Sequence, residues 1–338
     1  MKEFRPHRRL RNAHLMTIAA AFWPRKFPHL PKGTPRLFEV EKGTQVRGDC
    51  HWQRDPREHA TLVLVHGLEG SSDSGYMRGT AERAFAAGFN VVRLNQRNCG
   101  GTEHLTPTLY HSGRSADFRA VLMELIERDG LREIFFCGWS MGGNLVLKMA
   151  GELGGGAPRE LRGVAAVNPC LDLAACVEAL GERRNLVYSR HFVRRLKGRM
   201  RRKAELYGEI YSLGALGRVR SVRDFDELVT APHCGFAGAD DYYARSSAMH
   251  VLGEIRVPAL ILTAKDDPFV PFGTFEGEAI RGNPKIRLAA TEFGGHCGFI
   301  AEDRAERFWS EARVVEFCGE LATETQRHGG SERQLSNG

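Results

Sequence analysis

The sequence predicts an α/β protein in which a mostly parallel central sheet is flanked by helices. Two patterns support this class: short apolar, β-branched segments recur along the chain, and segments with a helical stripe of apolar residues lie between them. A third observation adds an insertion, because residues 170–250 show no clear strand and are too many for a bare connection. We therefore expect a helical cap between the strands near 168 and 258.

The elements expected along the chain follow one another in strand–helix order. Residues 36–52 alternate weakly between apolar and polar side chains, which is typical of one or two edge strands. Buried strands are expected at 60–65, 89–94, 134–137, 163–168, 258–264 and 286–292. Helices are expected at 76–87, 116–129, 141–153 and 303–322.

The chain of 338 residues is long enough for one large α/β domain, which we place at residues 1–322. Residues 323–338 are rich in Thr, Gln, Gly, Ser and Asn and are expected to form a disordered tail. Near the N-terminus, the apolar segment 15–23 follows basic residues, as in a signal peptide. Pro24 and two basic residues come next, without a cleavage site of small residues, so we interpret the segment as mature sequence.

The net charge of +7 is unevenly distributed along the chain. Residues 1–40 contribute +7 and residues 183–203 contribute +10, so the rest of the chain carries −10. A body this acidic is not that of a uniformly basic nucleic-acid-binding protein, and no nucleic acid partner is expected. The mean hydropathy is −0.34 and no apolar run reaches the length of a membrane span. The eight cysteines include no Cys-x-x-Cys pair, which favours reduced thiols in a cytoplasmic protein.

A candidate nucleophile lies where the strand at 134–137 meets the following helix. The segment Gly138-Trp139-Ser140-Met141-Gly142 has the Gly-x-Ser-x-Gly pattern in the strand–turn–helix context that a nucleophile elbow requires. Such a sharp turn leaves no room for bulky neighbours two residues on either side, so Gly138 and Gly142 fit it. The alternative is a glycine-rich turn with an idle serine. The context favours Ser140 as the catalytic nucleophile.

Two backbone N–H groups are candidates for stabilising the oxyanion that forms during attack by Ser140. The N–H of Met141 lies at a helix N-terminus, beside the nucleophile. The second donor of such folds comes from the loop after the first central strand, here residues 66–70, and the candidate is the N–H of Leu68. The alternative for this loop is a plain turn.

A serine nucleophile needs a base and an acid that orients the base. His296, between glycines after the last expected strand, is the candidate base. Asp266 and Asp267 follow the preceding strand, and both loops lie at carboxyl ends of strands, where ligands bind in open α/β sheets. We prefer Asp267, which precedes Pro268, by analogy with the fold, and Asp266 stays open as the alternative.

These segments and several others resemble the YheT-like branch of the α/β-hydrolases, which in eukaryotes includes membrane-associated abhydrolase-domain lipases and ethanol acyltransferases. The resemblance covers about Phe4 to Cys318. It implies the α/β-hydrolase fold, a Ser140–Asp267–His296 triad and esterase-like activity on acyl esters. The segments that carry it are Leu10-Arg11-Asn12-Ala13-His14-Leu15-Met16-Thr17, His66-Gly67-Leu68-Glu69-Gly70, Leu109-Tyr110-His111-Ser112-Gly113, Gly138-Trp139-Ser140-Met141-Gly142-Gly143-Asn144, Phe225-Asp226-Glu227-Leu228-Val229-Thr230-Ala231-Pro232, Asp241-Tyr242-Tyr243, Asp266-Asp267-Pro268 and Gly294-Gly295-His296-Cys297-Gly298.

The basic segment 183–203 has two interpretations. Apolar residues at Phe192, Leu196, Met200 and Tyr207 fall near helical spacing, with Arg and Lys between them. A basic amphipathic helix of this kind can lie on an anionic membrane surface, so peripheral contact with a membrane is one hypothesis. The other is a cap helix with its apolar stripe on the core and a solvated Arg face. We prefer the second, because Gly198 interrupts the helical pattern.

The leading hypothesis for function is a serine hydrolase that cleaves carboxylic (acyl) esters, taken as small-molecule substrates, through an acyl-enzyme on Ser140. An acyltransferase that passes the same acyl group to an alcohol is the alternative. A lipid-surface or nucleic-acid-binding protein with an idle pocket is the third hypothesis. No metal and no nucleotide cofactor is expected, because the sequence has no His-x-x-x-His, Cys-x-x-Cys or strand-linked Gly-x-Gly-x-x-Gly pattern.

Overall fold

The computed structural model describes residues 1–335 and their side chains as far as residue 323. Its strands are β1 Thr34–Glu41, β2 Thr44–His51, β3 Thr61–Val65, β4 Asn90–Leu94, β5 Ile134–Trp139, β6 Leu161–Val167, β7 Ala259–Ala264 and β8 Ile286–Thr291. Its helices are α1 Ala13–Phe22, α2 Gly75–Ala86, α3 Ser115–Glu127, α4 Met141–Leu153, α5 Leu173–Gly181, α6 Leu186–Leu206, α7 Val222–Phe225, α8 Ala231–Cys234, α9 Ala239–Ser246, α10 Glu278–Arg281 and α11 Trp309–Leu335.

The strands form one eight-stranded sheet in the order β1-β2-β4-β3-β5-β6-β7-β8. β2 is antiparallel to both of its neighbours, and the pairs from β4 to β8 are parallel. The predicted fold class, a mostly parallel sheet flanked by helices, is therefore confirmed. Because all the parallel strands end at the same edge, the loops that follow them are brought together there.

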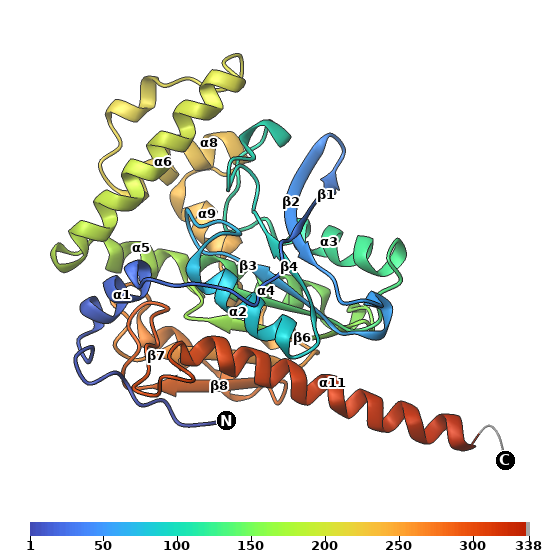
Figure 1. The fold of residues 1–338 in the computed structure, drawn as a ribbon. Coiled ribbons are helices and arrows are strands. Elements are labelled where there is room, and N and C mark those ends of the chain that lie inside the picture. The colour runs from blue at the N-terminus through green and yellow to red at the C-terminus, as the bar shows by residue number, and fades with distance from the viewer. Residues whose placement is uncertain (336–338) are drawn as a thin grey trace.

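Helices cover both faces of this sheet (Figure 1). Successive strand residues point to opposite faces, so β3 supplies both layers of the core. Leu62 and Leu64 pack in one cluster with α2 and α11, and Val63 and Val65 pack in another with α3 and α4. β3 is completely buried, which explains why its sequence is a continuous apolar run rather than an alternating one.

Helices α5–α9 lie between β6 and β7 and gather at one end of the sheet (Figure 1). Apolar side chains of α6 pack with Leu109 and Phe269, which belong to loops at that end. This segment corresponds to the helical cap expected at 170–250. It covers the loops that carry the candidate catalytic residues.

α6 differs from the sequence prediction in two respects. Gly198 does not interrupt it: the helix is continuous from Leu186 to Leu206. Leu196 and Met200 are buried, as the apolar stripe predicts, but so are two cations, Arg199 and Lys203. The basic face is therefore not wholly solvated, because part of it contacts acceptors in loops of the sheet domain, which we call the body.

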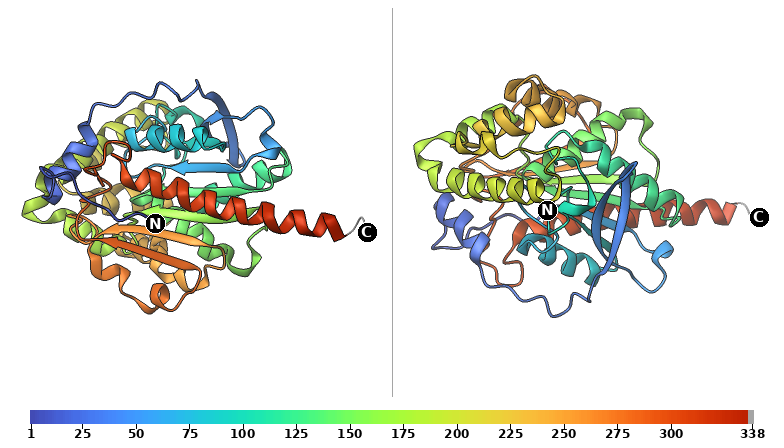
Figure 2. Two further views of the ribbon diagram at one scale, coloured as in Figure 1. Left: turned by 60° about the horizontal axis from the view of Figure 1, so that its bottom comes forward. Right: turned by 90° about the horizontal axis from the view of Figure 1, so that it is seen from above.

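The N-terminal segment wraps around the molecule and joins α1 to β1 along the outside of α2 (Figure 2). Arg25 fixes its path by pairing with the buried Glu311 of α11 at 2.6 Å. Gly79 of α2 allows this approach, because a Cβ there would lie within 1.8 Å of the Arg25 guanidinium. The segment therefore packs on the body as part of the fold.

The C-terminal helix begins and ends later than predicted. The expected start at 303 is wrong, because Ile300 pairs with Phe308 as an antiparallel bridge and residues between them form a loop. The expected disordered tail from 323 is also not observed as far as Leu335, because α11 continues to that residue. Residues 336–338 lie outside the described part. No helix of residues 1–335 is long and apolar enough to cross a bilayer.

Candidate active site

Ser140 lies in the sharp turn between β5 and α4. Its φ of 53° and ψ of −119° are strained values for a residue with a side chain. The two glycines of the motif are required by close backbone contacts: a Cβ on Gly138 would lie 2.1 Å from the carbonyl oxygen of Gly142, and a Cβ on Gly142 would lie 2.4 Å from that of Val65. The local sequence therefore permits a turn that presents Ser140 at the carboxyl end of the sheet.

The structure brings His296 and Asp267 to Ser140 from two other loops. His296 follows β8, and its Nε2 lies 2.9 Å from Ser140 Oγ. Asp267 follows β7, and its Oδ2 lies 2.8 Å from His296 Nδ1. The Asp267 carboxylate is fully buried and accepts a hydrogen bond from the Nδ1–H of His296, which leaves Nε2 free to accept the proton of Ser140. The three residues predicted from separate segments thus form one continuous hydrogen-bonded chain.

The two adjacent aspartates have different contacts. Oδ1 of Asp267 accepts hydrogen bonds from the backbone N–H groups of Phe269 and Val270, at 2.8 and 3.1 Å, which fix the carboxylate while Oδ2 faces His296. Asp266 instead accepts the N–H of Gly295 at 2.8 Å. Asp266 therefore holds the loop of His296 by its backbone, and Asp267 contacts the imidazole.

Charge and burial act in opposite directions on the imidazole of His296. Burial by itself lowers the pKa of His296, because it disfavours the charged form. Taken together, the charge and hydrogen bond of Asp267 and the neighbouring Cys297 outweigh burial and raise the pKa of His296 well above its usual value. This pairing makes the ring a better proton acceptor for the Ser140 hydroxyl.

Asn168 belongs to the site but was missed by the sequence analysis. It follows β6 with a φ of 43°, and its Nδ2 donates hydrogen bonds to Asp267 Oδ2 and, at 3.1 Å, to the carbonyl of Gly295. It thereby links the acid loop and the base loop. The available signal was a polar residue directly after an apolar strand and before Pro169, at the same edge as the other site loops.

The backbone around Leu68 is fixed so that its N–H has a defined direction. The carbonyl of Gly67 accepts from the N–H of Gly70 at 3.0 Å and from Nδ1 of His66 at 2.8 Å. The C=O and the N–H of a trans peptide point in opposite directions, so the Leu68 N–H points away from these donors. A Cβ on Gly67 would lie 3.2 Å from the Cβ of Ser140, which places this turn against the nucleophile.

His66 has a role that the sequence analysis did not assign. Its Nε2 accepts the backbone N–H of Gln96 at 3.1 Å, so the ring proton is on Nδ1 and is donated to Gly67. Burial lowers the pKa of His66 to about 4, so the ring stays neutral near pH 7. Met141 is the first residue of α4, where backbone N–H groups have no acceptor within the helix.

A cavity of about 980 Å³, including its solvent-open part, lies between the cap and Ser140. Side chains from the cap and from loops give it a largely apolar lining, among them Leu109, Leu180, Phe192, Leu196, Val222 and Phe225. One carboxylate occurs in the described lining, that of Asp226, and it accepts from Thr230 at 2.8 Å and from Tyr243 at 2.9 Å. The cavity therefore suits an apolar group that extends from the nucleophile.

Comparisons with known proteins show to which family the chain belongs. Residues 60–303 match the family model described as alpha/beta hydrolase fold. The YheT protein of Escherichia coli (strain K12) is 34% identical over 93% of this chain and 92% of its own length. Medium-chain fatty acid ethyl ester synthase/esterase 2 of Saccharomyces cerevisiae is 26% identical over 85% of this chain and 67% of its own length.

Among solved structures, the Pyrococcus furiosus esterase Pf2001 superposes with a TM-score of 0.57. The alignment covers 95% of this chain and 98% of that one, at 17% identity, and so shows the fold alone. The family match over residues 60–303 and the full-length similarity to YheT go further. The chain therefore belongs to the alpha/beta hydrolase fold family, in its YheT-like branch.

Proposed function

We propose that this alpha/beta hydrolase is a serine carboxylesterase that forms an acyl-enzyme on Ser140. The observation that carries the proposal is the chain of hydrogen bonds from Ser140 Oγ through His296 to Asp267, at 2.9 and 2.8 Å. Ser140 attacks the ester carbonyl while His296 takes its proton. His296 then gives that proton to the departing alcohol, and a water activated by His296 releases the acid.

The N–H groups of Leu68 and Met141 stabilise the tetrahedral intermediates in this mechanism. Both residues line the cavity next to Ser140. Loss of one such donor lowers kcat by about 10²–10³-fold. The largely apolar lining supports a substrate with an apolar acyl chain, because burying each methylene contributes about 0.8 kcal/mol.

The test compares the wild-type protein with Ser140→Ala on p-nitrophenyl esters with acyl chains of two to sixteen carbons. We expect activity in the wild type, a preference for a chain that the cavity can hold, and background activity in Ser140→Ala. A fluorophosphonate probe provides an independent readout, because it should label Ser140 in the wild type only. Equal hydrolysis by both proteins would show that the activity does not depend on Ser140.

A second outcome for the acyl-enzyme is transfer to an alcohol. The name of the yeast relative, an ethyl ester synthase and esterase, motivates this alternative. Both reactions share the same first half, so they differ only in whether water or an alcohol reaches the acyl group. Product analysis with increasing ethanol separates them: a constant rate of acyl release with growing ethyl ester would indicate transfer, and free acid alone would indicate hydrolysis.

We further propose that one surface beside the site contacts an anionic membrane. We call it the α1–α6 surface; its exposed apolar side chains are Leu15, Ile18, Phe22, Leu186 and Val187, and its exposed basic ones are Arg11, Lys26, Arg183, Arg184 and Arg190. α1 and α6 adjoin here, since the ring of His14 stacks on that of Tyr188. Apolar side chains that enter the interface, within a basic rim, are what an anionic lipid surface attracts.

The α1–α6 surface lies close to the catalytic residues. Tyr188 packs against Phe269 with ring centroids 4.6 Å apart, and Phe269 packs against His296 at the same distance. An ester delivered from a lipid phase would therefore arrive beside the nucleophile. Contact with a membrane at this surface would therefore shorten the path of a lipid ester to Ser140 in the proposed reaction.

Vesicle co-sedimentation tests this contact. We expect binding to vesicles that contain anionic phosphatidylglycerol, weaker binding to pure phosphatidylcholine, and loss of binding with added salt. Val187→Ser combined with Phe22→Ser should weaken binding. Leu206→Ser is the matched control, because Leu206 is also exposed but lies at the opposite end of α6. Equal binding by all three proteins would refute the proposal.

A further inference from the structure

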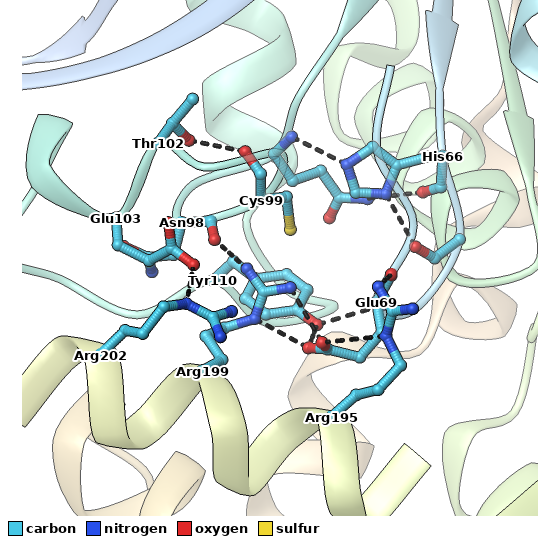
Figure 3. Close-up of polar contacts among 12 residues, drawn as sticks. His66, Glu69, Asn98, Cys99, Thr102, Glu103, Tyr110, Arg195, Arg199 and Arg202 are labelled. Atoms are coloured by element: carbon cyan, nitrogen blue, oxygen red, sulfur yellow. Dashed lines mark hydrogen bonds and ion pairs between the residues drawn. The ribbon is translucent and has the colours of Figure 1, made fainter. Parts of the chain in front are cut away.

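The loop that carries the Leu68 N–H is attached to the cap through the next residue, Glu69. Arg199 of α6 holds the Glu69 carboxylate with two hydrogen bonds, Nε to Oε1 at 2.8 Å and Nη2 to Oε2 at 2.9 Å. Tyr110 donates its hydroxyl to the same Oε1 at 2.7 Å. Figure 3 shows these groups converging on Glu69 from α6 and from a loop of the body. Two parallel hydrogen bonds from a planar guanidinium fix the direction of the Glu69 carboxylate as well as its distance from Arg199.

The backbone of Glu69 is held as firmly as its side chain. Its φ of 56° is in the left-handed region, which residues other than glycine rarely adopt. Its N–H donates to the Tyr110 hydroxyl at 3.3 Å, and its carbonyl accepts from Nη2 of Arg195 at 2.7 Å. Every polar group of this residue is therefore used, and the interactions stabilise a conformation that the isolated chain would avoid.

The pair is charged and largely removed from water. The side chains of Arg199 and Glu69 are only 6% and 3% exposed. Burial would raise the pKa of Glu69, but the hydrogen bonds and charge of Arg199 lower it, so the carboxylate stays ionised. Arg199 also lies 4.8 Å from the ring centroid of Tyr110 and donates Nη1 to the carbonyl of Asn98. Several fixed groups thus hold the guanidinium itself.

We propose that Arg199 is a positioning residue for the oxyanion hole and acts through Glu69 on the N–H of Leu68. Leu68 lies between two peptide planes. His66 and Gly70 hold the plane on its N-terminal side through the carbonyl of Gly67. Arg199 and Tyr110 hold the residue on its C-terminal side. With both ends fixed, the Leu68 N–H points in one direction before the substrate arrives, which is what oxyanion stabilisation requires.

This inference rests on the proposed esterase function and adds a structural condition to it. Arg199 belongs to the cap, whereas Leu68 belongs to the body. The oxyanion hole is therefore complete only when α6 is seated on the loop. A buried ion pair contributes little net stability compared with apolar packing, so its place next to a catalytic N–H is better explained by orientation.

Steady-state kinetics of Arg199→Met on a p-nitrophenyl ester test the proposal. We expect kcat to fall at least about tenfold, since a displaced donor loses part of the effect of a missing one, while KM changes less than about threefold. Arg199→Lys should recover part of kcat. Arg202→Met is the matched control, because Arg202 is on the same helix but pairs with Glu103 at 2.7 Å, in another loop. Its kcat should stay near wild type.

A trifluoromethyl ketone inhibitor gives a readout that a purely structural role would not change. It adds to Ser140 Oγ, and the resulting hemiketal oxygen carries the negative charge that the Leu68 N–H would stabilise. Its Ki should rise in Arg199→Met by about the same factor by which kcat/KM falls. Because Arg199 and Tyr110 also line the cavity, a direct role in substrate binding would raise KM and leave kcat unchanged, which would overturn the proposal.

The double variant Glu69→Gln with Arg199→Met guards against misfolding, because it leaves no unpaired buried charge. It should fold, label with fluorophosphonate at Ser140, and keep the loss of kcat. Wild-type kcat in this folded variant would also overturn the proposal. Ser140→Ala distinguishes failure of the positioning role from failure of the esterase mechanism. If Ser140→Ala is inactive while Arg199→Met keeps full kcat, only the positioning role of Arg199 fails. If Ser140→Ala stays active, the esterase mechanism fails as well.

Discussion

The hydroxyl oxygen of Thr17, in the N-terminal helix α1, accepts a hydrogen bond of 2.8 Å from the backbone N–H of His296. The same hydroxyl donates to the carbonyl of Ala13 at 2.7 Å. Gly295 makes this approach possible, because a Cβ there would lie 2.5 Å from the Ala13 carbonyl. The N-terminal segment thus contacts the loop that carries His296, although it lies outside the matched family region of residues 60–303.

Thr17→Val should weaken both the fold and the reaction. Valine has nearly the same shape but leaves the His296 N–H without a partner, which costs about 1–3 kcal/mol for a buried donor. We expect a lower urea midpoint and a kcat reduced severalfold, with Ser140 still labelled by fluorophosphonate. Thr323→Val is the control, because that hydroxyl bonds only to Gly319 on an exposed helix surface. An unchanged midpoint in Thr17→Val would contradict the role of this contact.

The two aspartates after β7 should respond differently to the same change. Asp267→Asn removes the charge that stabilises the His296 imidazolium and should lower kcat by about 10⁴-fold. Asp266→Asn keeps an oxygen that can accept the Gly295 N–H, so most activity should remain. Parallel measurements of kcat/KM on one ester decide the assignment. Greater loss in Asp266→Asn than in Asp267→Asn would reverse it.

The pH dependence of kcat/KM should show the raised pKa of His296. The base works only when neutral, so activity is full above this pKa and is lost as pH falls through it. Because Asp267 raises the pKa, the loss should begin above pH ~6.5, the usual histidine value. In Asp267→Asn the midpoint should move to lower pH. If the midpoint of the pH profile in the wild type lies near the usual histidine pKa, the charge of Asp267 does not raise the pKa of His296.

Gly142→Ala should damage the turn that presents Ser140. The added Cβ would lie 2.4 Å from the Val65 carbonyl oxygen, a backbone atom of the central strand that cannot move aside. We expect a melting temperature lower by several degrees and activity near background. Gly155→Ala is the matched control, because no atom lies within 4 Å of the added Cβ. Comparable melting temperatures for the two variants would argue against a tightly packed turn.

Local sequence was sufficient to predict the sheet and most of the candidate catalytic residues. Buried parallel strands must be continuous apolar runs, and a strand–helix turn as sharp as that at Ser140 requires Gly138 and Gly142. In this fold the acid and the histidine follow the nucleophile in the chain, which predicts them in the loops after the last two strands, where Asp267 and His296 lie. These constraints act within a few residues, so they can be identified without knowing what packs against them.

The contacts that join distant segments depend on tertiary packing. Nothing near Asn168, Thr17 or Arg199 in the sequence shows that they contact Asp267, His296 and Glu69, because each partner is supplied by another part of the chain. For the same reason the basic pattern of α6 could not show that Arg199 would be buried against a carboxylate. The amino-acid sequence was enough to predict the class of fold and the candidate reactive groups, whereas the packing of α1 and of the cap orients those groups.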